Sequence, residues 1–313
     1  MVGQRFQILS LDGGGIKGLF SAAVLSAIEE DLETNIIDHF DLITGTSTGG
    51  IIALGLASGL SPREIVEFYT SKGPEIFYSN RRTKWRHWLR NKYSEDPLKA
   101  ALKSCFKDKR IADCSKRVVI PSYNIGEDDV YLFRTPHATR LRRDWKVPLW
   151  KVALATSAAP TYFPCSRHVD KLRLIDGGVW ANNPTMVGIV EAYGTLDIPL
   201  KDIRVFSVGT SDAVTHRKQN LDTGGLLKWA KTATDVIMRG QSIGVNNQAS
   251  FLLGKENVER WNPSVASEEF SLDGVKKADD LIGKASHVSR QCMPNFHEKF
   301  FPHQALKYEP HYK

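Results

Sequence analysis

The sequence predicts an α/β fold of three layers, with a mostly parallel central sheet flanked by helices. Apolar segments with strand character at 5–11 and 40–44 are each followed by a glycine-rich turn and then by a helical pattern. This alternation is typical of parallel strands that are joined by helical crossovers. A third observation, the apolar run at 202–210, indicates another strand that is buried in the sheet.

The composition is that of a globular protein without a membrane span. Of the 313 residues, 42% are hydrophobic and 25% are charged. No apolar run approaches the ~18 residues of a transmembrane helix, and the N-terminus lacks a signal-peptide pattern, so we expect a cytoplasmic protein. The net charge of +7 favours anionic partners such as phospholipid headgroups or nucleotides. The four cysteines have neither CxxC nor zinc-ligand spacing, which indicates reduced thiols and no metal site.

The elements of the first 76 residues follow from pattern and capping. A strand at 5–11 is followed by a helix from about Lys17 to Leu32, and a strand at 40–44 by a helix from 49 to about 58. Ser61, Pro62 and Glu64 then have the types preferred at the N-cap, N1 and N3 positions. These three residues predict the start of a third helix.

Residues 73–117 are basic, aromatic and weakly periodic, and we interpret them as an insertion or cap over the sheet. Within them, Trp85, Trp88 and Leu89 would share one face of a helix among Lys and Arg residues. Such a segment could lie at a bilayer interface, cover the active site, or be a solvated basic helix that packs its tryptophans on the core. No module that recognises polymeric nucleic acid accompanies it.

The rest of the chain adds strands and then helices. We expect strands at 117–124, 130–133, 172–178 and 202–210, a helix at 150–157, and C-terminal helices at 223–255 and 274–290. We therefore expect a single domain over 1–313, with its core at about 5–210 and a mainly helical part at 211–313. In the first C-terminal helix, Arg239 and Asn246 to Gln248 would serve packing and capping, or ligand sensing.

The turn after residue 44 carries the most informative motif, Gly-Thr-Ser-Thr-Gly at 45–49. A strand that turns sharply into a helix exposes the turn residue, and Gly45 and Gly49 let the two elements pack closely around Ser47. Ser47 is therefore a candidate nucleophile for acyl transfer.

The glycine-rich turn at 13–18 matches G-x-G-x-x-G and has two readings. One is a dinucleotide site, but the second strand ends in the serine turn rather than in the acidic residue that would hold a ribose. The other places the amides of Gly13, Gly14 and Gly15 beside Ser47, where they would stabilise an oxyanion. Lys17 would add positive charge nearby.

A nucleophilic serine needs a base, and the sequence offers two candidates. His216 lies in a polar loop after the strand at 202–210 and would complete a Ser-His-Asp esterase for small soluble esters. Asp176 ends a short strand before Gly177 and Gly178, and its carboxylate could accept the serine proton directly.

Three motifs in this order resemble the patatin-like phospholipases: Asp-Gly-Gly-Gly-Ile-Lys-Gly at 12–18, Gly-Thr-Ser-Thr-Gly at 45–49 and Asp-Gly-Gly at 176–178. The resemblance spans about 5–210 and includes the stretches 155–163 and 182–184. It implies a lipid acyl hydrolase of phospholipase A type that has a Ser47–Asp176 dyad and needs neither a catalytic histidine nor a cofactor. It implies an oxyanion hole of Gly13, Gly14 and Gly15, the family's basic residue at Lys17, and supporting glycines at Gly45, Gly49 and Gly177.

A narrower similarity is to bacterial phospholipases that act in antiphage systems. Cyclic oligonucleotides activate these enzymes. It implies a cyclic dinucleotide activator such as cGAMP, a membrane phospholipid substrate, and peripheral contact with the inner membrane when the enzyme is active. No activator motif can be read from the sequence, and monomer and homo-oligomer both stay open. The competing class is a catalytically inert module that binds nucleotides or membranes.

Overall fold

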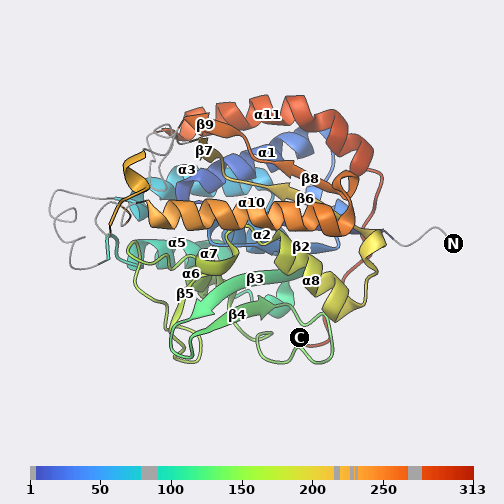
Figure 1. The fold of residues 1–313 in the computed structure, drawn as a ribbon. Coiled ribbons are helices and arrows are strands. Elements are labelled where there is room, and N and C mark those ends of the chain that lie inside the picture. The colour runs from blue at the N-terminus through green and yellow to red at the C-terminus, as the bar shows by residue number, and fades with distance from the viewer. Residues whose placement is uncertain (1–4, 79–90, 215–218, 226–228, 230–231, 267–276) are drawn as a thin grey trace.

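The computed structural model describes residues 5–78, 91–214, 219–225, 229, 232–266 and 277–313. Within them, a seven-stranded sheet has the order β4-β3-β2-β1-β6-β8, and β5 pairs with β3 (Figure 1). The strands are β1 (Phe6–Leu11), β2 (Leu42–Gly45), β3 (Arg117–Asn124), β4 (Asp129–Arg134), β5 (Leu174–Asp176), β6 (Ile203–Val208) and β8 (Val258–Trp261). Two further strands, β7 (Asp212–Val214) and β9 (Ser264–Ala266), form a separate pair.

The helices lie on both faces of this sheet. They are α1 (Gly18–Leu32), α2 (Thr48–Ala57), α3 (Pro62–Ile76), α5 (Asp96–Phe106), α6 (Leu149–Thr156), α7 (Gly178–Ala181), α8 (Thr185–Leu196), α10 (Ala233–Leu253) and α11 (Ala278–Lys299). The sheet is parallel from β3 through β2, β1 and β6 to β8, whereas β4 and β5 run antiparallel to β3. The predicted three-layer α/β fold is therefore confirmed.

Alternate residues of each central strand face different helical layers. On β1, Leu9 packs into a core with α1, α2, α3, α5, α6 and α11, whereas Ile8 packs into a second core with α8 and α10. The side chains of Ile8 and Leu9 are both fully buried. The strands are apolar on both faces because helices cover both faces, as in other parallel sheets.

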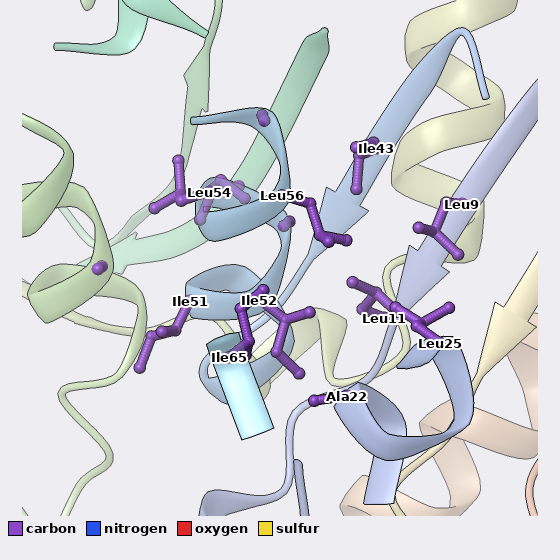
Figure 2. Packing of buried hydrophobic residues seen from close by; sticks show 14 of the residues in the cluster. Leu9, Leu11, Ala22, Leu25, Ile43, Ile51, Ile52, Leu54, Leu56 and Ile65 are labelled. Atoms are coloured by element: carbon purple, nitrogen blue, oxygen red, sulfur yellow. The ribbon is translucent and has the colours of Figure 1, made fainter. Parts of the chain in front are cut away.

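The helix that follows the serine turn is buried on every side. All ten residues of α2 are buried, and Figure 2 shows Ile51, Ile52 and Leu54 packed among side chains of neighbouring elements. A helix that is apolar all round belongs inside a protein core. The start of α2 is therefore held rigidly by packing.

The capping prediction for the third helix is also confirmed. Ser61 accepts a hydrogen bond from the backbone N–H of Glu64, and the Glu64 carboxylate accepts one from the N–H of Ser61. This reciprocal capping box begins α3 at Pro62.

Residues 91–117 differ from the insertion that the sequence suggested. They contain α5, whose Leu98, Leu102 and Phe106 are buried in the main core. The helix was missed, although its buried residues Leu98, Ala101, Leu102 and Phe106 recur at helical spacing and Pro97 lies in its first turn. The predictions for Trp85, Trp88 and Leu89 concern residues outside the described part of the chain.

The sheet also continues beyond the expected core at 5–210. Strand β8 pairs in parallel with β6, and α8 and β8 were not predicted from the sequence. Five aromatic side chains then join β6 and β8 to the C-terminal helix: Phe206 stacks edge-on against Trp261 at 4.9 Å and against Phe296 at 5.1 Å, and Phe40 and Phe300 complete the group. All four cysteines are free thiols, as expected.

Replacing Phe296 by Ala should lower the free energy of unfolding by about 3–5 kcal/mol, because a fully buried aromatic ring leaves a cavity. Urea denaturation followed by tryptophan fluorescence measures this change. The matched control is Phe251→Ala on α10, where the ring is 87% exposed, and its effect should stay within about 0.5 kcal/mol. Equal effects of the two variants would contradict the packing of the C-terminal helix in the core.

Candidate active site

Ser47 lies in a strained turn between β2 and α2. Its φ of 55° and ψ of −122° are values that residues with a side chain rarely adopt, and such a conformation costs about 1–3 kcal/mol. The Ser47 N–H donates to Thr156 Oγ1 at 3.0 Å, and the Ser47 carbonyl accepts from the N–H of Ile51 at 3.0 Å. Thr156 Oγ1 in turn donates to the Pro121 carbonyl at 2.6 Å. The turn is thus fixed from α6 as well as from α2.

The two glycines of the motif are required by close backbone approach. A Cβ on Gly45 would lie 2.1 Å from the Gly49 carbonyl oxygen, and a Cβ on Gly49 would lie 2.2 Å from the Leu11 carbonyl oxygen. Both contacts are with backbone, which cannot move aside as a flexible side chain does. These positions therefore hold glycine so that β1, β2 and α2 can converge at Ser47.

The glycine-rich turn lies next to Ser47, as predicted from adjacent strands. Leu11 at the end of β1 pairs in register with Gly45 at the end of β2, so the two following turns lie at one edge of the sheet. Thr48 Oγ1 donates to the Gly15 carbonyl at 2.7 Å. A Cβ on Gly13 would lie 3.3 Å from the Cβ of Ser47.

The amides of the three glycines differ in their hydrogen bonding. The Gly13 N–H donates to the Asn182 carbonyl at 3.0 Å. The Gly14 and Gly15 amides have no hydrogen-bond acceptor among the residues that the structure describes. In this arrangement, Gly14 and Gly15 can donate to a ligand beside Ser47, whereas the Gly13 amide is already engaged.

Lys17 lies at the end of the same turn and reaches across to the segment after β6. Its Nζ donates to the Ser211 carbonyl at 3.3 Å. The structure therefore places this cation between the glycine-rich turn and the end of the neighbouring strand.

Asp176 ends β5, whose pairing with β3 brings its carboxylate to Ser47. The side chain is buried at 5% exposure and accepts a hydrogen bond from the Gly178 N–H at 2.7 Å. Burial raises the pKa of Asp176 from 3.8 to about 6, although hydrogen bonds from the Ser47 side chain and from the Gly178 N–H lower it. Gly177 is needed here because a Cβ would lie 2.4 Å from the Pro121 carbonyl oxygen.

These groups have the geometry of acyl-transfer chemistry. The Ser47 side chain lies near enough to the Asp176 carboxylate to lower its pKa, which burial raises to about 6, close to the working range of a general base. The N-terminus of α2 and the unengaged amides of Gly14 and Gly15 offer positive dipole ends to an oxyanion.

No histidine of the described residues hydrogen-bonds to Ser47 or Asp176. His137 pairs with Glu191, and His168 pairs with Glu95. His39 contacts Thr34 and the His303 carbonyl, and His303 contacts Asp41. His216, the sequence-based candidate for a triad, lies outside the described residues.

Sequence reasoning missed several side chains that position the site. The stretches containing Thr156 and Asn182 were noted only as parts of a resemblance, without roles. Arg260 on β8 pairs with Asp12, at 2.6 Å from Nη2 to Oδ2, just before the glycine-rich turn. No local signal marks Arg260, because its partner lies 248 residues away in the sequence.

Comparisons with known proteins place this chain among known sequences and folds. The family model described as Patatin-like phospholipase matches residues 9–189. A Pseudomonas aeruginosa protein named cGAMP-activated phospholipase is 33% identical over 313 residues, which cover 96% of this chain and 93% of that protein. An Escherichia coli protein of the same name is 37% identical over 226 residues, covering 66% of this chain and 62% of that protein. Among solved structures, VipD from Legionella pneumophila is 12% identical with a TM-score of 0.45, over 90% of this chain and 67% of that one.

Replacing Thr156 by Val should slow the reaction of Ser47 with a fluorophosphonate probe by about tenfold or more, because the Ser47 N–H loses its acceptor in a strained turn. Mass spectrometry of the labelled peptide over time measures the rate. Thr156→Ser is the matched control, since it keeps the hydroxyl and should label near the wild-type rate. Labelling of Thr156→Val at the wild-type rate would show that this hydrogen bond does not position Ser47.

Proposed function

Because the chain belongs to the patatin-like phospholipase family and is a lipid ester hydrolase, we propose that it cleaves fatty-acyl esters of membrane phospholipids through a Ser47–Asp176 dyad. The observation that carries the proposal is the buried Asp176 carboxylate, whose pKa is raised by burial and lowered in part by the neighbouring Ser47 side chain. The absence of a histidine partner for either residue among the described histidines also supports it.

The reaction proceeds in two acyl-transfer steps. Asp176 accepts the proton of Ser47 Oγ as that oxygen attacks the ester carbonyl. The amides of Gly14 and Gly15 stabilise the oxyanion of the tetrahedral intermediate, and the proton passes to the departing lysophospholipid alcohol. Asp176 then removes a proton from water as the water attacks the acyl-serine, and it gives that proton to Ser47 Oγ when the bond to the acyl group breaks and the fatty acid leaves.

Activation by a cyclic dinucleotide is the second part of the proposal. Its support is the name cGAMP-activated phospholipase carried by relatives in Pseudomonas aeruginosa and Escherichia coli. The excess of positive charge suits both an anionic nucleotide and an anionic bilayer. The role in antiphage defence stays a prediction.

Contact with the membrane is proposed as peripheral. Of the helices in the described part of the chain, none is both long enough and apolar enough to cross a bilayer. A basic protein can instead approach anionic headgroups electrostatically, which would bring ester bonds to Ser47 without insertion.

Ser47→Ala and Asp176→Asn should each reduce fatty-acid release from phospholipid liposomes to background, because one lacks the nucleophile and the other cannot accept a proton. Gas chromatography of free fatty acids, with and without added cGAMP, measures the effect. His216→Ala is the control and should keep most of the activity. If His216→Ala loses activity while its circular dichroism spectrum is unchanged, a Ser-His-Asp triad replaces the dyad.

The pH profile follows from the raised pKa of Asp176. A base acts only when ionised, so kcat/KM should fall about tenfold per pH unit below the Asp176 pKa of about 6. A carboxylate with the ordinary pKa of 3.8 would instead keep full activity at pH 5. Initial rates on a soluble p-nitrophenyl ester between pH 4 and 9 separate these cases, and an inflection near 4 would contradict the assigned base.

A catalytically inert binding module is the competing class, and Ser47 reactivity tests it. A fluorophosphonate probe labels a serine that a base activates, so the wild-type chain should be labelled at Ser47 and Asp176→Asn should not. Absence of wild-type labelling both with and without cGAMP would favour the inert module.

A further inference from the structure

A hollow of about 540 Å³ lies between α10 and the described residues 221–224 and Trp229, which precede it in the sequence. It is lined in part by Leu221, Asp222, Trp229, Val236, Arg239 and Ile243. The Trp229 indole is 36% exposed, and its Nε1 donates to the Leu221 carbonyl at 3.2 Å. The volume lies within the range of about 300–1,000 Å³ typical of small-molecule sites.

The two sides of α10 have different partners. Val236, Arg239, Gly240 and Ile243 are spaced i, i+3, i+4 and i+7, so they share the face that lines the hollow. Gln241 and Ser242 lie on the opposite side of α10, which faces the edge of the sheet where Ser47 lies. Figure 1 shows α10 as one continuous helix across the front of α7 and α8.

Gln241 connects this helix to the glycine-rich turn. Its Oε1 accepts from the Asn183 N–H at 3.0 Å, and its Nε2 donates to the Asn183 carbonyl at 3.2 Å. The preceding residue, Asn182, holds the Gly13 N–H through its own carbonyl. Gln241 on α10 is thus hydrogen-bonded to the residue that follows the acceptor of the Gly13 N–H.

Ser242 reaches the same turn by a second route. Its Oγ accepts from Arg260 Nη2 at 3.0 Å, and the same guanidinium binds Asp12 through both carboxylate oxygens, at 3.2 and 2.6 Å. Asp12 directly precedes Gly13. Two consecutive residues of α10 are thus connected to two consecutive residues of the turn that carries the oxyanion-binding amides.

We propose that this hollow is the binding site for the cyclic dinucleotide activator, and that α10 transmits its occupancy to the glycine-rich turn through Gln241 and Ser242. The assignment rests on the proposed activation of a lipid hydrolase. The Arg239 side chain lines the hollow and brings a positive charge that attracts a phosphodiester. The Trp229 ring offers a stacking surface for a base, and the Asp222 carboxylate accepts from N–H groups at a base edge.

The energetic role of the nucleotide follows from linkage. A ligand shifts a conformational equilibrium only by its difference in affinity for the two states. Cyclic dinucleotide binds more tightly to the arrangement of α10 in which Asn182 and Arg260 hold Asp12 and Gly13 in the geometry that serves Ser47. The apo chain populates that arrangement less and releases fatty acid more slowly.

Calorimetric titration of the purified full chain with cGAMP tests the site. Arg239→Gln should weaken the Kd by about tenfold or more, because a charge-assisted contact with phosphate is lost. Ile243→Glu, at a position that is 45% exposed and tolerant of charge, should weaken it similarly by repelling phosphate. Arg290→Gln removes the same charge from an exposed position on α11 and should bind as the wild type does.

Gln241→Ala tests the transmission separately, since its side chain faces Asn183 and not the hollow. It should bind cGAMP with the wild-type Kd but gain less fatty-acid release on binding.

Wild-type binding by Arg239→Gln and Ile243→Glu, with unchanged thermal melting, would overturn the location of the site. Full activation of Gln241→Ala would overturn the transmission. Failure of the wild type itself to bind cGAMP would remove the proposed activation, while fatty-acid release that depends on Ser47 would preserve the hydrolase.

Discussion

The parallel pairing of β1 with β2 is the constraint on which the rest of the site depends. Because Leu11 and Gly45 end their strands in register, the glycine-rich turn and the Ser47 turn leave the sheet at one edge. The helices that follow both present their N-termini there, with positive dipole ends. Ser47, the N-cap of α2, keeps a strained backbone because the fully buried helix fixes the position of the residue that follows it.

In the proposed reaction, the carboxylate of Asp176 takes the role of the base that a histidine has in many other hydrolases. Burial raises the pKa of Asp176, and the Ser47 side chain and the Gly178 N–H lower it in part, so that the pKa is about 6. A carboxylate in water is too weak a base for this task, whereas a buried one without donors would be protonated at neutral pH. The environment therefore gives an acid the basicity for which many hydrolases use an imidazole.

The C-terminal third of the chain contributes to this site rather than merely following it. Arg260 on β8 and Ser242 on α10 surround the carboxylate of Asp12, and all three belong to a single hydrogen-bonded group. Asp12 is nearly fully buried, so removing Arg260 would take a charged partner from a buried carboxylate, which is destabilising. The glycine-rich turn is thus held by a buried ion pair as well as by the strand before it.

The sequence by itself determined the features that depend on neighbours in the chain. The strained serine turn, the glycine-rich turn and the capping box at Ser61 are set by steric and hydrogen-bonding rules over a few residues, and the apolar strands are set by their composition. The meeting of the first two turns followed from the order of strands and helices, and the family resemblance supplied the pairing of Ser47 with Asp176.

Only the tertiary structure decided which distant groups meet. The acceptor of the Gly13 amide and the partner of Asp12 could not be predicted from local pattern. Each arises from contacts between segments far apart in sequence, where many alternative partners have similar chemistry. The pKa of Asp176 belongs to this group too, because desolvation is a property of the whole surrounding fold and not of the Asp-Gly-Gly motif.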